Sequence, residues 1–184
     1  MSEIKEPLLA CRNDPDDVKP LSEVQGAKVD EVFIGSRMIN IGHFRTATKL
    51  LKSSGERIPT QVWIVPSTKI DVAQLFEAEI YNIHVSSRTR TEMSGYSLCM
   101  CNQALIEAGS TAVSSSTRSF PNHLGKGADV YHSPAALTLV AAILGKLQSI
   151  AEYTGKLDTM SPEIYKYLNF DRMPQYIDSS KRGQ

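Results

Sequence analysis

The sequence predicts an α/β fold, a three-layer sandwich built on a mainly parallel sheet. Short segments rich in β-branched residues alternate along the chain with segments whose apolar residues recur at helical spacing. Hydrophobic residues make up 41% of the chain, which is enough for an ordinary core. A chain of 184 residues fits one domain, which we place at residues 1–174, followed by a polar tail at residues 175–184.

The first half of the chain begins with a short apolar segment at residues 8–11 and a turn at residues 13–17, where Asn and Asp side chains can bond their own backbone. The composition then predicts strands over residues 29–34 and 61–65. Helical spacing predicts helices over residues 41–51 and 71–81. Asp71 is the expected cap of the second helix.

In the second half, a helix is expected over residues 98–108, and strands are expected over residues 111–115 and 129–132. Pro134 opens a helix that runs to about Leu147, since proline suits a first helical turn. A final helix is expected over residues 162–168. Because the loops after parallel strands emerge at one edge of a sheet, we expect residues 35–40 and 114–127 to lie together.

The charge balance limits the classes of partner. Lys and Arg number 20, as do Asp and Glu, so the formal net charge is zero. Nucleic acids and anionic membranes select basic surfaces, so neither is expected as the main partner. No apolar run reaches the roughly 18 residues that span a bilayer. Residues 1–6 match neither a signal peptide nor a basic presequence.

Two loops carry specific motifs. Residues 95–103 read Gly-Tyr-Ser-Leu-Cys-Met-Cys-Asn-Gln, and residues 35–40 read Gly-Ser-Arg-Met-Ile-Asn. Both resemble the cluster-binding loops of aconitase B, the bacterial-type aconitate hydratase, which read Gly-Cys-x-x-Cys-x-Gly-Asn-Gln and Gly-Ser-Cys-x-x-Asn. The resemblance runs in order from about Ile4 to about Phe170 and concerns only the last, cluster-bearing domain of that larger enzyme. It implies the fold of the aconitase iron–sulfur domain. Further matching segments are residues 6–11, 13–18, 29–36, 41–45, 90–93, 124–128 and 165–170.

The resemblance also implies which residues stand where the family holds its cluster. In the family, three cysteines bind a 4Fe-4S cluster. Here Arg37 and Tyr96 stand at two of these positions, and Cys99 at the third. Arginine stays protonated and tyrosine is a poor ligand for a soft cluster, so we expect no such cofactor, no metal and no catalytic residue. Arg37 and Tyr96 are expected to fill the vacated cavity.

Residues 114–123 resemble the family's substrate-carboxylate loop, in which two arginines grip a tricarboxylate. Arg118 stands at the first arginine position and His123 at the second. Neutral imidazole cannot reproduce the bidentate fork of a guanidinium, so half of this clamp is lost. Ser116 and Thr117 could still help Arg118 to bind a lone anion. Asn40 and Gln103 match family positions near the cluster and complete this remnant substrate-binding set.

The three cysteines, Cys11, Cys99 and Cys101, form an odd set that indicates a reducing compartment rather than a disulfide framework. Cys99 and Cys101 are expected to be half-buried thiols at a helix start, which lowers a thiol pKa and makes them candidates for redox sensitivity. A metal shared with His123 or His132 is an alternative, although a closed zinc site needs four ligands.

These observations favour a catalytically degenerate aconitase-like domain, a pseudoenzyme that acts as a structural or interaction subunit of a larger protein complex. The three replacements, Arg37, Tyr96 and His123, are expected to fall in one pocket. The alternative is a fragment or subunit of an aconitate hydratase, a lyase that interconverts citrate and isocitrate with a 4Fe-4S cluster. A ligand sensor and an RNA-binding protein are weaker alternatives.

The expected partners are other protein subunits, in an assembly that could itself be membrane-associated. The resemblance to aconitase implies that the chain descends from an enzyme of the tricarboxylic acid cycle. It implies a setting in a mitochondrion, a plastid or the bacterial cytoplasm.

Overall fold

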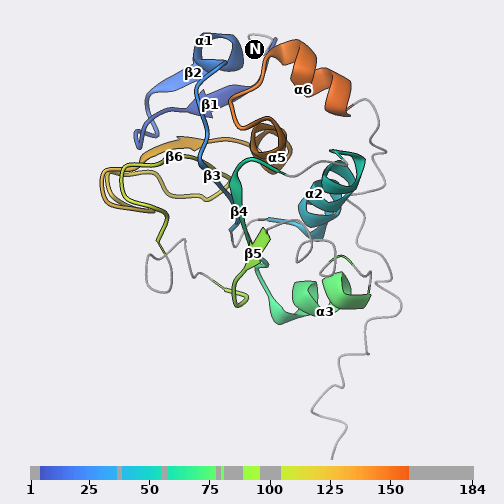
Figure 1. Cartoon of the computed structure of the whole chain (residues 1–184). Helices are drawn as coiled ribbons and strands as arrows, with labels where there is room; N and C mark the ends of the chain where they lie inside the picture. The colour runs from blue at the N-terminus through green and yellow to red at the C-terminus, as the bar shows by residue number, and fades with distance from the viewer. Residues whose placement is uncertain are drawn as a thin grey trace, which may run out of the picture.

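The computed structural model describes residues 5–36, 39–54, 58–77, 80, 89–95 and 105–157. Short strands and helices alternate along them (Figure 1). The elements are β1 (Leu8–Ala10), β2 (Val18–Pro20), α1 (Leu21–Val24), β3 (Glu31–Gly35), α2 (Ile41–Ser54), β4 (Gln61–Val65), α3 (Lys69–Glu77), β5 (Thr89–Thr91), β6 (Thr111–Ser114), β7 (Asp129–His132), α5 (Ala135–Leu144) and α6 (Ile150–Leu157).

The strands form one sheet of seven, in the order β2-β1-β7-β6-β3-β4-β5. The strands from β7 to β5 pair in parallel, and the β1–β2 hairpin adds an antiparallel edge next to β7. The central strand β3 is buried along its whole length, as expected for a parallel strand covered on both faces. The predicted α/β fold with a mainly parallel sheet is therefore confirmed.

Helices α2 and α5 cover one face of the sheet (Figure 1). Val32 and Ile34 of β3 point into this layer together with Ile64 of β4. Helix α5 is apolar around its circumference and nearly all of its residues are buried, which is typical of a helix in the interior of a domain. The main core of the protein thus lies between α2, α5 and the sheet.

The opposite face of the sheet carries a second apolar cluster. Phe33 and Trp63 alternate with the residues of the first face, because successive side chains of a strand point to opposite sides. Ile106, Leu124 and Ala128, from the segment after β5, cover them. The sheet is therefore the middle of three layers, and the described part of the third layer consists of two irregular segments, residues 105–110 before β6 and residues 115–128 after it.

Two expected boundaries prove wrong. Thr68, and not Asp71, caps α3: Asp71 Oδ2 accepts hydrogen bonds from Thr68 N at 3.0 Å and from Thr68 Oγ1 at 2.7 Å. Asp71 N donates in return to Thr68 Oγ1 at 3.1 Å, so the two residues form a reciprocal capping box. Helix α5 ends at Leu144 instead of Leu147, because Gly145 takes a left-handed conformation with φ of 69°.

The expected helix at residues 98–108 is wrong for its described part. Residues 105–107 have no regular secondary structure, and Ile106 N donates to Leu124 O at 2.9 Å instead of to its own segment. Residues 98–104 and the expected helix at residues 162–168 lie outside the described residues. The sequence also left five short elements unpredicted: β1, β2, α1, β5 and α6.

Candidate functional site

The loops that follow β3 and β6 meet at one edge of the sheet, as predicted, and the loop that follows β4 joins them there. Ser115, just after β6, accepts a hydrogen bond from Gly35 N on its Oγ at 3.1 Å, and its own N donates to Phe33 O at 2.9 Å. Ser67, after β4, donates from its Oγ to the carbonyl oxygen of Ser36 and to that of Ile39, the second at 3.2 Å. Serine side chains therefore join the ends of three neighbouring strands.

Asn40, a member of the predicted substrate-binding set, lies directly before α2. Its Oδ1 accepts a hydrogen bond from Gly42 N at 2.7 Å, and its carbonyl oxygen accepts one from His43 N at 2.9 Å. These are the bonds of a helix N-terminal cap, which satisfy backbone donors that the helix leaves free. Its oxygen therefore already serves a structural purpose.

Ser116 organises the loop that carries Thr117 and Arg118. Its side chain is buried, its N donates to Ser114 Oγ at 3.0 Å, and its Oγ accepts from Arg118 N at 3.2 Å. Thr117 and Arg118 themselves are exposed. The structure thus presents these two side chains at the surface of a turn that the serines shape.

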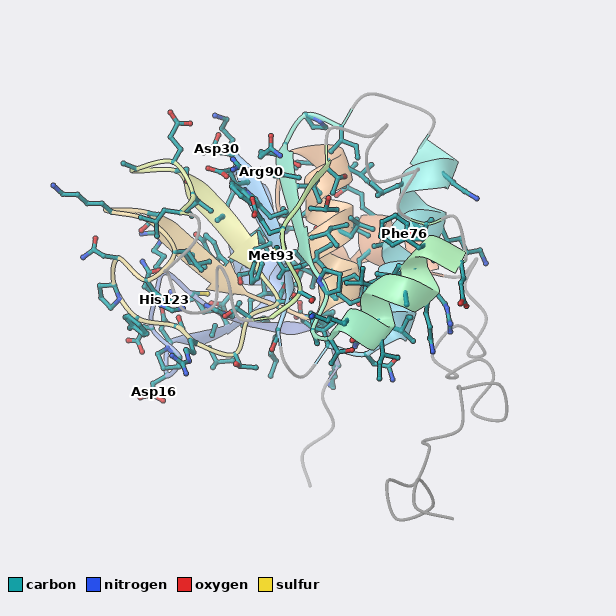
Figure 2. All side chains as sticks on the ribbon, turned by 90° about the horizontal axis from the view of Figure 1, so that it is seen from below. Asp16, Asp30, Phe76, Arg90, Met93 and His123 are labelled. Carbon is teal, nitrogen blue, oxygen red and sulfur yellow. The ribbon has the colours of Figure 1, made fainter. Side chains whose placement is uncertain are left out.

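His123, at the second arginine position of the resemblance, has a different environment. Only 3% of its surface is exposed, and its ring centroid lies 4.2 Å from that of Phe120. In Figure 2 it lies on the opposite side of the molecule from Phe76 of α3. Arg118 is exposed while His123 is packed inside the loop, so the two do not form a matched pair of surface cations.

His132, the last residue of β7, is a candidate that the sequence interpretation considered only as a metal ligand. Its Nδ1 lies 3.1 Å from the carbonyl oxygen of Ser116. Burial lowers the pKa of His132 below the ordinary value of about 6.5, and the nearby His123 lowers it further, while the hydrogen bond to Ser116 raises it. In the sequence, the feature that indicates His132 as a site residue is its position at the carboxyl end of a predicted parallel strand.

The other predicted site residues lie outside the described residues. They are Arg37, Tyr96, Cys99, Cys101 and Gln103. Within the described ranges, no group of three or more His, Cys, Asp or Glu side chains could hold a metal ion. The same ranges contain no helix that is long and apolar enough to cross a membrane.

Comparison with known proteins gives relatives over nearly the whole chain, although no protein-family model matches. The chain is 49% identical over 183 residues to aconitate hydratase B of Escherichia coli (strain K12), an alignment that covers 98% of this chain and 21% of that protein. It is 49% identical over 187 residues to aconitate hydratase B of Pseudomonas aeruginosa, covering 100% of this chain and 22% of that protein. It is 47% identical over 182 residues to aconitate hydratase B of Synechocystis, covering 97% of this chain and 21% of that protein.

The chain spans about one fifth of the length of the curated relatives that it matches. Identity of this level along the whole chain, together with a mainly parallel α/β sheet whose strand-end loops meet at one edge, confirms the resemblance drawn from the motifs. The chain is therefore a homologue of about one fifth of aconitate hydratase B and belongs to the aconitase family.

Proposed function

We propose that this chain is a catalytically degenerate aconitase-family domain that serves as a structural or interaction subunit of a larger protein assembly. The observation that carries the proposal is the donor set in the sequence: Arg37 and Tyr96 stand where the family resemblance places two of three cluster cysteines. A guanidinium cannot release its proton to bind iron, and it repels the cluster irons electrostatically.

The residues of this chain therefore do not fit a 4Fe-4S cluster. Cys99 supplies one thiolate at the family positions, and Cys101 adds a second thiol two residues away. Clusters of this type are held by several thiolates, because soft sulfur donors match iron–sulfur chemistry. We derive no catalytic step through such a group.

The geometry of the carboxylate loop supports the same proposal. Binding a tricarboxylate between two cations requires both cationic side chains to face the ligand. Arg118 is exposed, whereas His123 is buried against Phe120. This arrangement suits an anion contact by Arg118 alone.

Exposed apolar side chains support a protein partner. Phe76 on α3 and Met93 after β5 are 59% and 72% exposed, and both lie on the face shown in Figure 2. Single apolar residues are common on protein surfaces, so they support the proposal only together with the zero net charge, which suits an assembled protein.

The second candidate is a segment of an aconitate hydratase that interconverts citrate and isocitrate. The comparisons taken alone support this candidate more directly, because the relatives at 47–49% identity all carry that name. It would require the rest of the enzyme and a cluster held by other ligands. The residue chemistry at Arg37 and Tyr96 is what favours the degenerate domain.

Iron and sulfide analysis separates the two candidates. The full chain would be expressed with an ample iron supply, purified anaerobically and assayed for iron, sulfide and visible absorbance. The matched control is the double variant Arg37→Cys/Tyr96→Cys, which restores the thiols of the family pattern. We expect a colourless, iron-free wild type and a gain of iron and sulfide in the variant. Stoichiometric iron and sulfide in the wild type would overturn the proposal and favour the hydratase.

A further inference from the structure

One imidazole fastens the loop that carries Thr117 and Arg118 to the end of the sheet. His132 Nδ1 lies 3.1 Å from Ser116 O. A carbonyl oxygen can only accept a hydrogen bond, so Nδ1 must be the donor. In the neutral ring, Nε2 then carries no proton.

A proton on the second ring nitrogen of His132, Nε2, would have no acceptor among the described residues. His132 Nε2 is buried, and within the described part of the chain it has no hydrogen-bond partner. When the ring becomes charged, Nε2 gains an N–H that needs an acceptor. A buried donor without an acceptor and a buried charge without a counter-ion are both unfavourable.

The charged and titratable groups around His132 do not offset that charge. Next to β1, Cys11 is a buried thiol, and Arg12 is directed to Tyr131, with its Nε 3.4 Å from Tyr131 Oη. On β7 itself, Asp129 acts electrostatically on Arg12. Arg118, in the loop after β6, is itself positively charged and so cannot offset a charge on His132.

His123 completes this set of groups. It acts on His132 electrostatically and would carry a charge of the same sign when protonated. No carboxylate contributes to the electrostatics of His132 within the described residues. A second imidazole thus opposes the charge on the first.

Ser116 is the residue through which a change at His132 reaches the loop. Its backbone N is bonded to Ser114 Oγ, and its Oγ receives the backbone N of Arg118. Release of Ser116 O would loosen the turn that sets the position of Arg118.

We propose that His132, opposed by the neighbouring His123, forms an acid-sensitive latch on the loop of residues 115–118. Neutral His132 holds Ser116 O and keeps the turn closed. Nδ1 keeps its proton when the ring is charged, so the cost of charging lies at Nε2, which is buried and has no acceptor among the described residues. A ring that has left Ser116 O for solvent accepts this second proton more readily, so mildly acidic solution favours the open state, in which the turn is mobile. The latch residues all lie in the described part of the chain, and the latch is independent of which candidate function the chain has.

Nuclear magnetic resonance on the full chain tests the latch. The imidazole signals of His132 and the exchange rates of the Ser116 and Arg118 amides would be followed from about pH 7.5 to about pH 5, the range in which histidines titrate. After correction for the intrinsic pH dependence of exchange, we expect protection of these amides to fall about tenfold or more. The midpoint should match the titration of His132. Amides that keep their protection while His132 titrates would overturn the proposal.

A matched pair of variants isolates the histidine. In His132→Asn, the side-chain amide can still donate to Ser116 O but does not titrate, so protection of the loop should become independent of pH. The control is His43→Gln, since His43 lies on α2 and burial lowers its pKa as well. The control should keep the wild-type response. An unchanged pH response in His132→Asn would also overturn the latch, and the wild-type titration decides the question if that variant fails to fold.

Discussion

At the residue scale, the buried carboxylate of Glu31 joins the sheet to the segment that covers it. Glu31 is 7% exposed. Its Oε2 accepts from Trp63 Nε1 at 2.7 Å, and its Oε1 accepts from Glu107 N at 2.7 Å. The Arg90 guanidinium lies over the indole of Trp63, with Cζ 4.5 Å from the ring centroid. One side chain therefore satisfies donors from β4 and from the 105–110 segment.

Replacing this carboxylate should weaken the fold. In Glu31→Gln, one oxygen becomes an NH₂ group that faces a donor, so either Trp63 Nε1 or Glu107 N is left unsatisfied. We expect the free energy of unfolding to fall by about 2–3 kcal/mol, measured by urea denaturation.

The control for this change is Glu23→Gln, at an exposed position of α1. It should alter the free energy of unfolding by less than about 0.5 kcal/mol. Equal effects of the two variants would contradict a stabilising role for the Glu31 hydrogen bonds.

The motif residues show at the same scale what sequence reasoning can and cannot reach. The position of Ser116, Thr117 and Arg118 after a strand was predictable from the pattern and the resemblance. The burial of His123 was not, because it depends on packing against Phe120 in an irregular loop. Likewise, the bond between His132 and Ser116 joins residues 16 positions apart.

At the element scale, the close packing of the 105–110 segment against the 115–128 segment depends on Gly125. A Cβ at this position would lie 2.8 Å from both Cγ1 and the carbonyl oxygen of Ile106. Ile106 in turn lies in the cluster beneath Leu124. The absence of a side chain at Gly125 thus lets the two irregular segments approach each other.

Two alanine variants should have opposite effects. Gly125→Ala should lower the free energy of unfolding by about 1–3 kcal/mol, because the backbone of residue 106 must move. Gly155→Ala, in helix α6 with nothing within 4 Å of the added Cβ, should raise it by about 0.5–1 kcal/mol. Thermal unfolding of both variants beside the wild type measures the difference. If Gly125→Ala stabilised the protein instead, the added Cβ would not clash with Ile106, which would contradict the close packing described here.

Several elements were predictable because their signals are local. The strand at residues 61–65 and the start of α2 at Ile41 follow from β-branched composition and helical spacing. The glycine that ends α5, Gly145, is visible in the sequence. The apolar residue beyond it nevertheless led to a predicted helix end at Leu147. Leu147 instead donates its N to Ala27 O at 2.8 Å, a contact with a distant segment.

At the scale of the whole molecule, stability should depend on pH in two steps. Burial lowers the pKa of His43 and of His132, so the unfolded chain binds protons more readily than the folded one between the folded values and about 6.5. Hydrogen bonds lower the pKa of Asp30, through Lys28 and Thr111, and that of Glu152, through Ser149 and Lys146. The stabilisation from these carboxylates is present above their unfolded pKa and is lost as they become protonated in more acidic solution.

We therefore expect the free energy of unfolding to decrease from about pH 7.5 to about pH 5 as the two histidines become charged on unfolding. A second decrease should follow below about pH 4, in the range where carboxylates titrate. Urea denaturation at a series of pH values measures both. The double variant His43→Gln/His132→Asn should flatten the first step and leave the second. A wild-type stability that rises toward pH 5 would refute the assignment of these histidines as neutral in the fold.

The amino-acid sequence alone was sufficient for the α/β class, the places of the main strands along the chain, the family, and the meeting of the loops after the first and third predicted strands at one edge of the sheet. These features follow from local composition, from spacing and from short motifs, each contained in a few consecutive residues. The environments of His123, His132 and Glu31, and the non-helical path of residues 105–107, came only from the folded structure. They depend on burial and on contacts that no local pattern in the sequence specifies, and the free energy of such contacts is set by the arrangement of the whole chain.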